Sequence, residues 1–176
     1  PLGTYNCDNP ERIAVLPDGR FVVATVYDEA GIPLRFHEPS GQSVSGVNLA
    51  EKDIWAIVTH GEGFLAGVGG SVARITAEGE RGPMANGAAA YPILAAGEAL
   101  GKGKKPAGLA AVGQEAFVAL PGLNVVRVID LATGAKKADW PVPDVGDLAA
   151  DEKGTLWVLS GRQVVSLGAG GQVQKR

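Results

Sequence analysis

The sequence contains a single cysteine, Cys7, among its 176 residues and lacks any long apolar run. One thiol excludes a disulfide within the chain, so Cys7 is either a small buried or edge residue or a reactive or intermolecular thiol. A membrane-spanning helix needs about 20 apolar residues, so we expect no membrane span. His37 and His60 do not form an H-x-x-H or H-x-x-E-H motif, and the sequence has no C-x-x-C. It therefore lacks the spacings that are typical of zinc sites.

The sequence also lacks a large excess of positive or negative charge. The formal net charge is -3, and no long acidic or basic run occurs. Proteins that bind nucleic acid concentrate Lys and Arg on one surface, so we expect no nucleic-acid partner. The sequence also lacks the G-x-S-x-G elbow and a Ser-His-Asp order that could form a triad. We therefore predict no catalytic and no cofactor-binding residues.

Glycine and proline, by contrast, are abundant, with 26 and 11 residues, and they favour many turns over long helices. The segment 108–134 shows the resulting pattern, because it holds three short apolar runs rich in β-branched residues. The breaks between these runs fall at 113–115 and 121–124. Runs of this kind predict strands of an antiparallel meander.

The same plan recurs four times along the chain, and each copy ends on a glycine. The terminal glycines are 38, 55 and 37 residues apart; they are Gly41, Gly79, Gly134 and Gly171. A period near 40 residues with three or four short strands per copy is typical of β-propeller blades. The longer interval contains 17 extra residues, which fall in the segment 80–106.

The predicted fold is an all-β propeller of four blade-like repeats in a single domain, 1–176. Its blades are predicted at 10–49, 52–97, 106–143 and 144–176, with an insertion at 80–106 and a possible closing strand at 4–7. Four blades must splay strongly to close a ring, and an open array would leave apolar faces and strand edges uncovered. The chain is therefore predicted to form a compact four-blade ring, to close a larger ring with a second copy, or to be a fragment of a larger propeller.

Two segments resemble known repeat families. The opening at 106–119 resembles NHL-type and YVTN-type propeller repeats, and 125–134, VVRVIDLATG, is similar to the V-x-V-I-D-x-x-T-G segment of YVTN repeats. The latter also resembles, more distantly, the quinoprotein-type repeat, in which a tryptophan follows D-x-x-T-G. Trp140 stands one residue later than that pattern. The resemblance implies a propeller, and it leaves open a fragment of a quinoprotein-type enzyme.

Three aspartates are the candidate metal ligands: Asp144, Asp147 and Asp53. Inner strands of propellers commonly present ligands near the axis, and carboxylate oxygens there suit Ca²⁺. The alternative is that Asp147, like Asp151, makes Asx-type hydrogen bonds that shape tight turns. The D-x-D-x-D-G loop of a calcium site is missing.

The insertion 80–106 is the candidate partner-binding element, because long loops on a rigid scaffold often carry binding. Its aromatic and basic residues are predicted to contact the partner: Tyr91, Lys102, Lys104 and Lys105. The alternative is an insertion that is disordered or merely tolerated.

The sequence thus favours a non-catalytic scaffold or binding module for a protein partner, a ligand or a second copy, without a cofactor. The alternatives are a metal-dependent propeller enzyme of the lactonase or lyase type holding Ca²⁺, a quinoprotein fragment, or an excised or designed half-propeller. The start, 1–3, resembles the remnant of a cleaved tag, which predicts that a targeting segment has been removed. Localisation stays undecided, with a periplasmic or secreted protein favoured.

Overall fold

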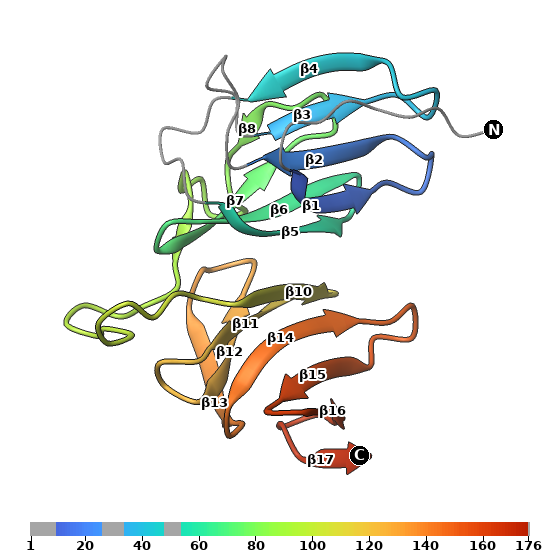
Figure 1. Ribbon diagram of the computed structural model, residues 1–176. Coiled ribbons are helices and arrows are strands. Elements are labelled where there is room, and N and C mark those ends of the chain that lie inside the picture. The colour runs from blue at the N-terminus through green and yellow to red at the C-terminus, as the bar shows by residue number, and fades with distance from the viewer. Residues whose placement is uncertain (1–9, 26–33, 48–53, 176) are drawn as a thin grey trace. The chain divides into compact units, whose positions relative to one another are not determined.

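The computed structural model describes residues 10–25, 34–47 and 54–175 (Figure 1). In these residues the chain forms strands and turns only, and they include no helix of the length and hydrophobicity that crossing a membrane requires. The chain divides into two compact units, Pro1–Pro83 and Met84–Arg176, which are described separately below as unit 1 and unit 2. The predicted closing strand 4–7 lies outside the described residues.

Unit 1 contains two antiparallel sheets in which each strand pairs with the next along the chain. The first sheet consists of β1 (Pro10–Val15), β2 (Phe21–Thr25), β3 (Leu34–His37) and β4 (Ser43–Val47). The second sheet has the order β5-β6-β7-β8, with β5 (Ile54–His60), β6 (Gly63–Val68), β7 (Ser71–Ile75) and β8 (Arg81–Gly82).

Unit 2 repeats this plan after a short strand, β9 (Tyr91–Pro92). The third sheet consists of β10 (Gly108–Val112), β11 (Glu115–Leu120), β12 (Val125–Asp130) and β13 (Lys136–Pro141). The fourth sheet consists of β14 (Val145–Ala150), β15 (Leu156–Ser160), β16 (Gln163–Leu167) and β17 (Val173–Lys175). All neighbouring strands in both sheets are antiparallel.

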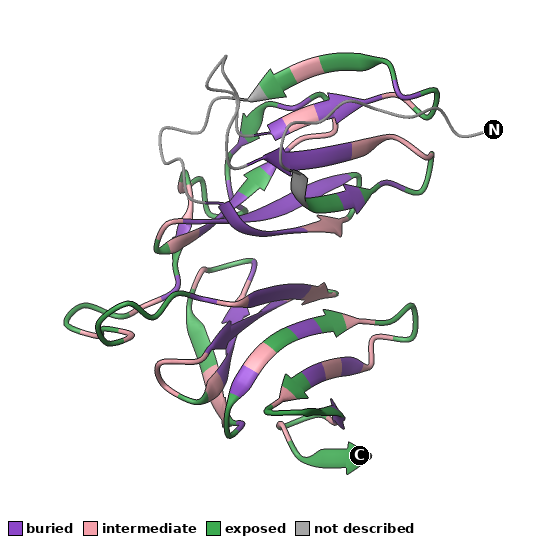
Figure 2. Cartoon of the chain, viewed as in Figure 1, coloured by how far each residue is buried: buried purple, intermediate pink, exposed green. Residues whose placement is uncertain are grey.

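The core of each unit lies between its two sheets, because alternate side chains of every strand point to the same face. In unit 1, Val22 and Phe36 of the first sheet pack with Phe64 of the second, and the Phe36 and Phe64 rings meet edge to face at 5.9 Å between centroids. In unit 2, Phe117 packs against Trp140, at 5.3 Å between ring centroids. Figure 2 shows this burial along the strands of each unit.

The glycine that ends each repeat has the same structural role in all four sheets. It lies in the turn between the third and fourth strand, and its φ is 86° at Gly41, 85° at Gly79, 78° at Gly134 and 82° at Gly171. Residues with a side chain rarely adopt this left-handed conformation, whereas glycine does so freely. The regular spacing of these glycines in the sequence therefore reports the spacing of four equivalent turns.

The fourth strands show where the sequence prediction needs correction. β4 and β13 lie within the segments expected to form them, 42–49 and 137–142, apart from one residue at the start of β13. In the second sheet the order β5-β6-β7-β8 ends on β8, at Arg81–Gly82, which the sequence did not predict, whereas the predicted segment 91–95 does contain a strand, β9. The hairpin needs only the turn at 76–80 to reach β8, so the sheet reaches into the segment predicted as an insertion. The predicted single domain and its blade limits remain predictions.

Candidate binding site

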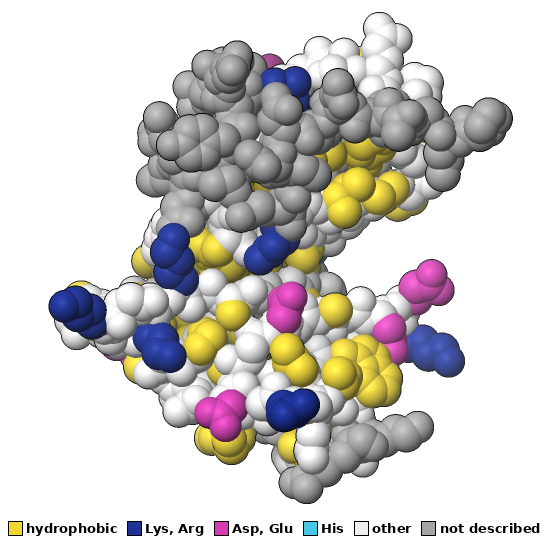
Figure 3. Space-filling model, viewed as in Figure 1, with side chains coloured by type: hydrophobic (Ala, Val, Ile, Leu, Met, Phe, Trp, Pro, Cys, Tyr) yellow, Lys and Arg dark blue, Asp and Glu magenta, His cyan; other side chains and the backbone are white. Residues whose placement is uncertain are grey.

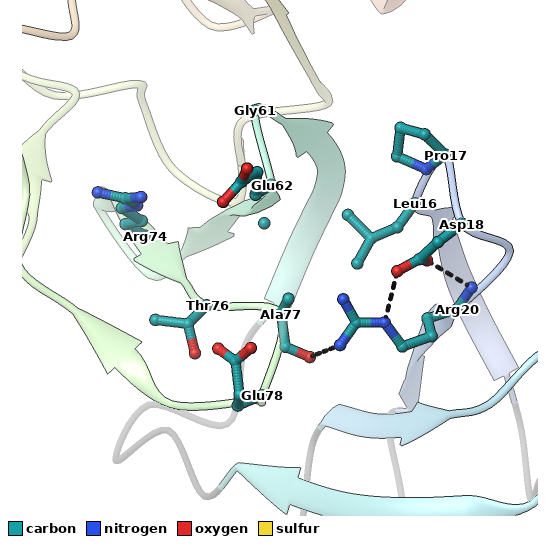
Figure 4. A pocket seen from close by; sticks show the side chains of 11 residues that line it. Leu16, Pro17, Asp18, Arg20, Gly61, Glu62, Arg74, Thr76, Ala77 and Glu78 are labelled. Atoms are coloured by element: carbon teal, nitrogen blue, oxygen red, sulfur yellow. Dashed lines mark hydrogen bonds and ion pairs between the residues drawn. The ribbon is translucent and has the colours of Figure 1, made fainter.

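Three segments of unit 1 surround a pocket of about 450 Å³ (Figure 4). They are the β1–β2 turn, the β5–β6 turn and the end of β7 with the turn that follows it. Since all three connect neighbouring strands, the pocket lies at the turn end of the two sheets. Its lining residues are Leu16, Pro17, Asp18, Arg20, Gly61, Glu62, Gly63, Arg74, Thr76, Ala77 and Glu78.

The β1–β2 turn is held in one conformation by its own hydrogen bonds. The Leu16 N–H donates to the Arg20 carbonyl at 2.7 Å, and the Gly19 N–H donates to the Leu16 carbonyl at 2.9 Å. Gly19 has φ 88°, which such a turn requires. The β7–β8 turn has the same pattern, with Thr76 N–H donating to the Glu80 carbonyl at 2.8 Å. Both turns are therefore rigid supports for the side chains that they carry.

Arg20 links the β1–β2 turn to the β7–β8 turn. Its Nε donates to Asp18 Oδ2 at 2.8 Å, and its Nη1 lies 3.5 Å from the Ala77 carbonyl oxygen (Figure 4). The backbone N–H and then the guanidinium of Arg20 lower the pKa of Asp18 below its usual value. Both groups are thus charged at neutral pH and neutralise each other.

Three further charged side chains remain available at the pocket: Glu62, Arg74 and Glu78. None of them makes a side-chain hydrogen bond or ion pair with another residue that the structure describes. Two carboxylates and one guanidinium leave the rim with one excess negative charge. The rim is therefore suited to a ligand that carries a positive charge.

A second pocket of about 260 Å³ adjoins the first and shares Leu16, Arg20, Ala77 and Glu78 with it. Its wall includes aromatic rings, among them Phe21 and His37, which are stacked with their centroids 4.8 Å apart. Its other lining residues are Phe36, Glu38, Val44, Ser45 and Phe64. The two pockets together offer a charged compartment beside a more apolar one.

The structure describes two of the three predicted metal ligands, Asp144 and Asp147. Asp147 Oδ1 accepts a hydrogen bond from the Leu148 N–H at 2.8 Å, and Asp144 has φ 48° in the turn before β14. Asp151 accepts N–H bonds from Lys153 and Thr155, which is the turn role considered as the alternative. Asp53 lies outside the described residues. Among those that are described, no three His, Cys, Asp or Glu side chains gather where a metal ion could be held.

The predicted partner-binding residues differ in their surroundings. Tyr91 is 2% exposed, and its hydroxyl donates toward the carbonyls of Leu131 at 3.2 Å and Ala132 at 3.3 Å. Lys102, Lys104 and Lys105 are exposed. Tyr91 therefore anchors the insertion within unit 2, while the lysines stay on the surface. The assignment of these four residues to partner binding remains a prediction.

Arg127 of β12 is the residue that sequence analysis missed. It is 1% exposed, and each of its five N–H groups has an acceptor. Glu98 receives two bonds, at 2.6 and 3.0 Å, Asp139 receives two, at 2.7 and 2.8 Å, and the Ile93 carbonyl receives one, at 2.8 Å. We call this set the Arg127 clamp. It ties the segment that contains Ile93 and Glu98 to the third sheet.

The free energy of unfolding is expected to fall as the pH is lowered from about 4.5 to about 2, because Glu98 loses its charge there. The Arg127 guanidinium, and then the Ala95 N–H, lower the pKa of Glu98 from 4.5 to about 2. A carboxylate whose pKa is lowered on folding stabilises the folded state above its unfolded pKa, and this contribution is lost as pH falls through the folded pKa. Urea unfolding at a series of pH values should show that the free energy of unfolding falls less steeply with decreasing pH in Glu98→Gln than in the unaltered protein. An equal slope in both proteins would contradict this role of Glu98.

No protein-family model matches the chain, and no curated protein matches it significantly. Solved structures do match. The chain is similar to a streptogramin B lyase, with TM-score 0.69 and 11% identity over 95% of this chain and 54% of the other. It is also similar to a 6-phosphogluconolactonase-like protein from Bacteroides uniformis, with TM-score 0.69 and 13% identity over 100% and 58%. A third similar structure is the computationally designed Ika4 protein, with TM-score 0.57 and 15% identity over 97% and 91%.

These comparisons, together with the four antiparallel sheets formed by the described residues, establish an all-β propeller fold. The chain spans just over half the length of the lyase and of the lactonase-like protein. At identities of 11% to 15% the similarity concerns the fold, which hosts many unrelated functions.

Proposed function

We propose that this propeller is a non-catalytic binding module and that the two adjoining pockets of unit 1 hold its ligand. The observation that carries this proposal is the pair of pockets itself, since a charged rim and an aromatic wall meet at Arg20 and Glu78. Ligand sites combine apolar surface with a few well-placed polar groups in volumes of about 300–1,000 Å³. The larger pocket, of about 450 Å³, falls within this range, and the smaller pocket adds about 260 Å³ of adjoining space.

The ligand that fits best is a short polypeptide segment with a basic side chain next to an apolar one. The Glu62 and Glu78 carboxylates would pair with the basic group at the rim. The apolar side chain would enter the second pocket, against the Phe21 ring. The paired charges of Asp18 and Arg20 favour neither sign of ligand charge, so Glu62 and Glu78, which outnumber the single guanidinium of Arg74, decide the specificity.

The proposal is tested with two capped dipeptides, acetyl-Lys-Phe-amide and acetyl-Glu-Phe-amide, titrated against the isotope-labelled protein by NMR. The lysine dipeptide should bind more tightly and shift the amide signals of residues 16, 18–20, 61–63 and 74–78. The double variant Glu62→Lys with Glu78→Lys should bind the lysine dipeptide about tenfold more weakly, because two partly exposed ion pairs contribute roughly 0.2–1 kcal/mol each and their loss is joined by repulsion.

Glu152→Lys is the matched control, because Glu152 is exposed in a turn of unit 2 and lines neither pocket. It should leave the affinity unchanged. Equal binding of the two dipeptides, or signal shifts confined to unit 2, would contradict the proposal.

A metal-dependent propeller enzyme remains the second candidate, since the similar structures include a lyase and a lactonase-like protein. A metal bound only by the folded chain raises its melting temperature. A thermal-shift scan with Ca²⁺, Mg²⁺ and Zn²⁺ therefore distinguishes this candidate from the binding module.

A further inference from the structure

The second pocket of unit 1 gathers most of the phenylalanines of the chain. Aromatic residues make up only 6% of the sequence, which contains four phenylalanines, and three of these four line this one pocket of about 260 Å³. They come from three different strands: Phe21 from β2, Phe36 from β3 and Phe64 from β6. His37 adds a fourth ring to the wall. The sheets of unit 1 thus concentrate a scarce residue type at one place.

The four rings stand in more than one orientation. Phe21 and His37 are stacked, with their planes 7° apart. Phe36 and Phe64 meet edge to face, with their planes 62° apart. The His37 ring is held by its Nδ1, which lies 3.1 Å from the Gly41 carbonyl oxygen. Phe21 is half-buried whereas the other three residues are buried, so its ring has the most surface for a ligand.

Two carboxylates, those of Glu38 and Glu78, add negative charge to the same wall. Neither side chain forms a hydrogen bond or ion pair with a residue that the structure describes. The guanidinium of the wall belongs to Arg20, and its Nε is bonded to Asp18 at 2.8 Å. Asp18 first, and then the charges of Glu78 and Glu38, raise the pKa of Arg20 above its usual value. Three carboxylates thus act on one guanidinium, which leaves two negative charges in excess.

This negative potential is local to the pocket. On the face of the described residues that Figure 3 shows, Lys and Arg side chains are interspersed with Asp and Glu. Figure 4 shows Glu78 next to Ala77, whose carbonyl group Arg20 approaches, and all three residues line both pockets. A ligand in the second pocket therefore meets aromatic rings and carboxylates together.

We propose that the second pocket binds a quaternary ammonium group, carried either by an N-trimethylated lysine side chain or by a small molecule such as choline. The proposal rests on the binding function proposed above and specifies the group that enters this pocket. Faces of aromatic rings attract cations, and clusters of such rings recognise quaternary ammonium groups. The methyl groups would also contact the apolar part of the wall, at Leu16, Val44 and Ala77.

Methylation matters because of the hydrogen bonds that an ammonium group must keep. The ammonium of unmodified lysine is strongly hydrated and has three N–H donors, so it would lose hydrogen bonds on entering a pocket with an aromatic wall. It is better placed at the charged rim of the first pocket. A quaternary ammonium has no N–H donor, and its apolar outer surface suits the second pocket.

The test compares choline with 3,3-dimethylbutan-1-ol, which has the same shape without the charge, by NMR titration of the isotope-labelled protein. Choline should bind at least about tenfold more tightly, because the alcohol lacks both the cation–π contact and the attraction to the carboxylates. It should shift the amide signals of residues 36–38, 44–45 and 77–78, which line the second pocket. A further titration with the amide of acetyl-trimethyl-lysine shows which carrier of the group binds more tightly.

Two variants separate the contributions of the ring and the charge. Phe21→Leu keeps an apolar side chain without the ring face and should weaken choline binding about fivefold, with a much smaller effect on the alcohol. Glu38→Gln should also weaken the binding of choline alone. This substitution leaves the turn intact, because the turn is held by the backbone bonds of Glu38 to Gln42 and Gly41. Glu152→Gln, in an exposed turn of unit 2, is the matched control and should change neither affinity.

Equal affinities of the unaltered protein for choline and the alcohol would overturn the inference, as would signal shifts confined to residues 61–63 and 74 of the first pocket. The proposed function would survive that result if the lysine dipeptide still bound more tightly than the glutamate dipeptide. Preferential binding of choline without a preference between the dipeptides would instead support the quaternary ammonium site and contradict the basic peptide ligand.

Discussion

Replacing Arg127 by methionine should lower the free energy of unfolding by about 3 kcal/mol. The substitution removes a buried cation and leaves Glu98 and Asp139 facing each other without it, and loss of one partner from a buried ion pair costs about 3–5 kcal/mol. The lower end is appropriate because the two carboxylates are 30% and 28% exposed and keep some hydration. Urea unfolding followed by circular dichroism measures the loss.

Two comparisons show whether charge or packing causes this effect. Arg162→Met removes an exposed arginine from unit 2 and should change the free energy of unfolding by less than about 0.5 kcal/mol. Adding Glu98→Gln and Asp139→Asn to Arg127→Met should recover part of the loss, because no uncompensated carboxylate remains. If the triple variant is no more stable than the single one, the clamp acts through packing rather than through its charges.

Gly134→Ala should destabilise unit 2 by about 3 kcal/mol, through two separate causes. The residue has φ 78°, and a side chain in this conformation costs about 1–2 kcal/mol. An added Cβ would also lie 2.4 Å from Cδ1 of the buried Tyr91, and overpacking of a core costs about 1–3 kcal/mol. The same urea unfolding measurement applies.

Gly87→Ala is the control that separates the two causes. Gly87 has φ 81° in a turn closed by a hydrogen bond from its N–H to the Met84 carbonyl, and nothing lies within 4 Å of the position that its Cβ would occupy. It should therefore show only the conformational cost, about 1 kcal/mol. If the two substitutions have equal effects, contact with Tyr91 contributes nothing to the requirement for glycine at 134.

The glycines explain why the fold could be predicted from sequence. A left-handed turn strongly favours glycine, so four equivalent turns place a conspicuous residue at a regular interval, and Gly41 and Gly79 were located from the apolar strand that precedes each of them. The strands between these glycines either alternate apolar with polar residues or are apolar throughout, because one or both faces of each sheet are covered. β8 was missed because two residues, Arg81 and Gly82, carry neither an apolar pattern nor β-branched side chains.

The candidate site could not be predicted in the same way. Arg20, Glu62 and Glu78 come from three separate turns, and only the packing of the first sheet against the second brings them to one pocket. For the clamp, part of the signal was present. Arg127 stands between Val126 and Val128 in an apolar strand, and an arginine at a core position requires acidic partners.

Only one of those partners follows from local pairing. Asp139 lies directly opposite Arg127 in the β12–β13 ladder, so the hairpin itself predicts it. Glu98 reaches Arg127 from a long irregular segment whose course no periodicity describes. The sequence therefore contained enough information to expect a buried ion pair, but not to identify the residue that completes it.

The Arg127 clamp also decides what happens when a protease nicks the chain. Trypsin would recognise the exposed Lys102 and Lys104, which lie after Glu98 and before β10. The piece that ends at the cut would still be joined to the third sheet by the Glu98 carboxylate and the Tyr91 hydroxyl, both of which bond to groups beyond the cut. The two pieces should therefore stay associated, so that this loop offers a place where the protein can be made as two separate polypeptides that reassemble.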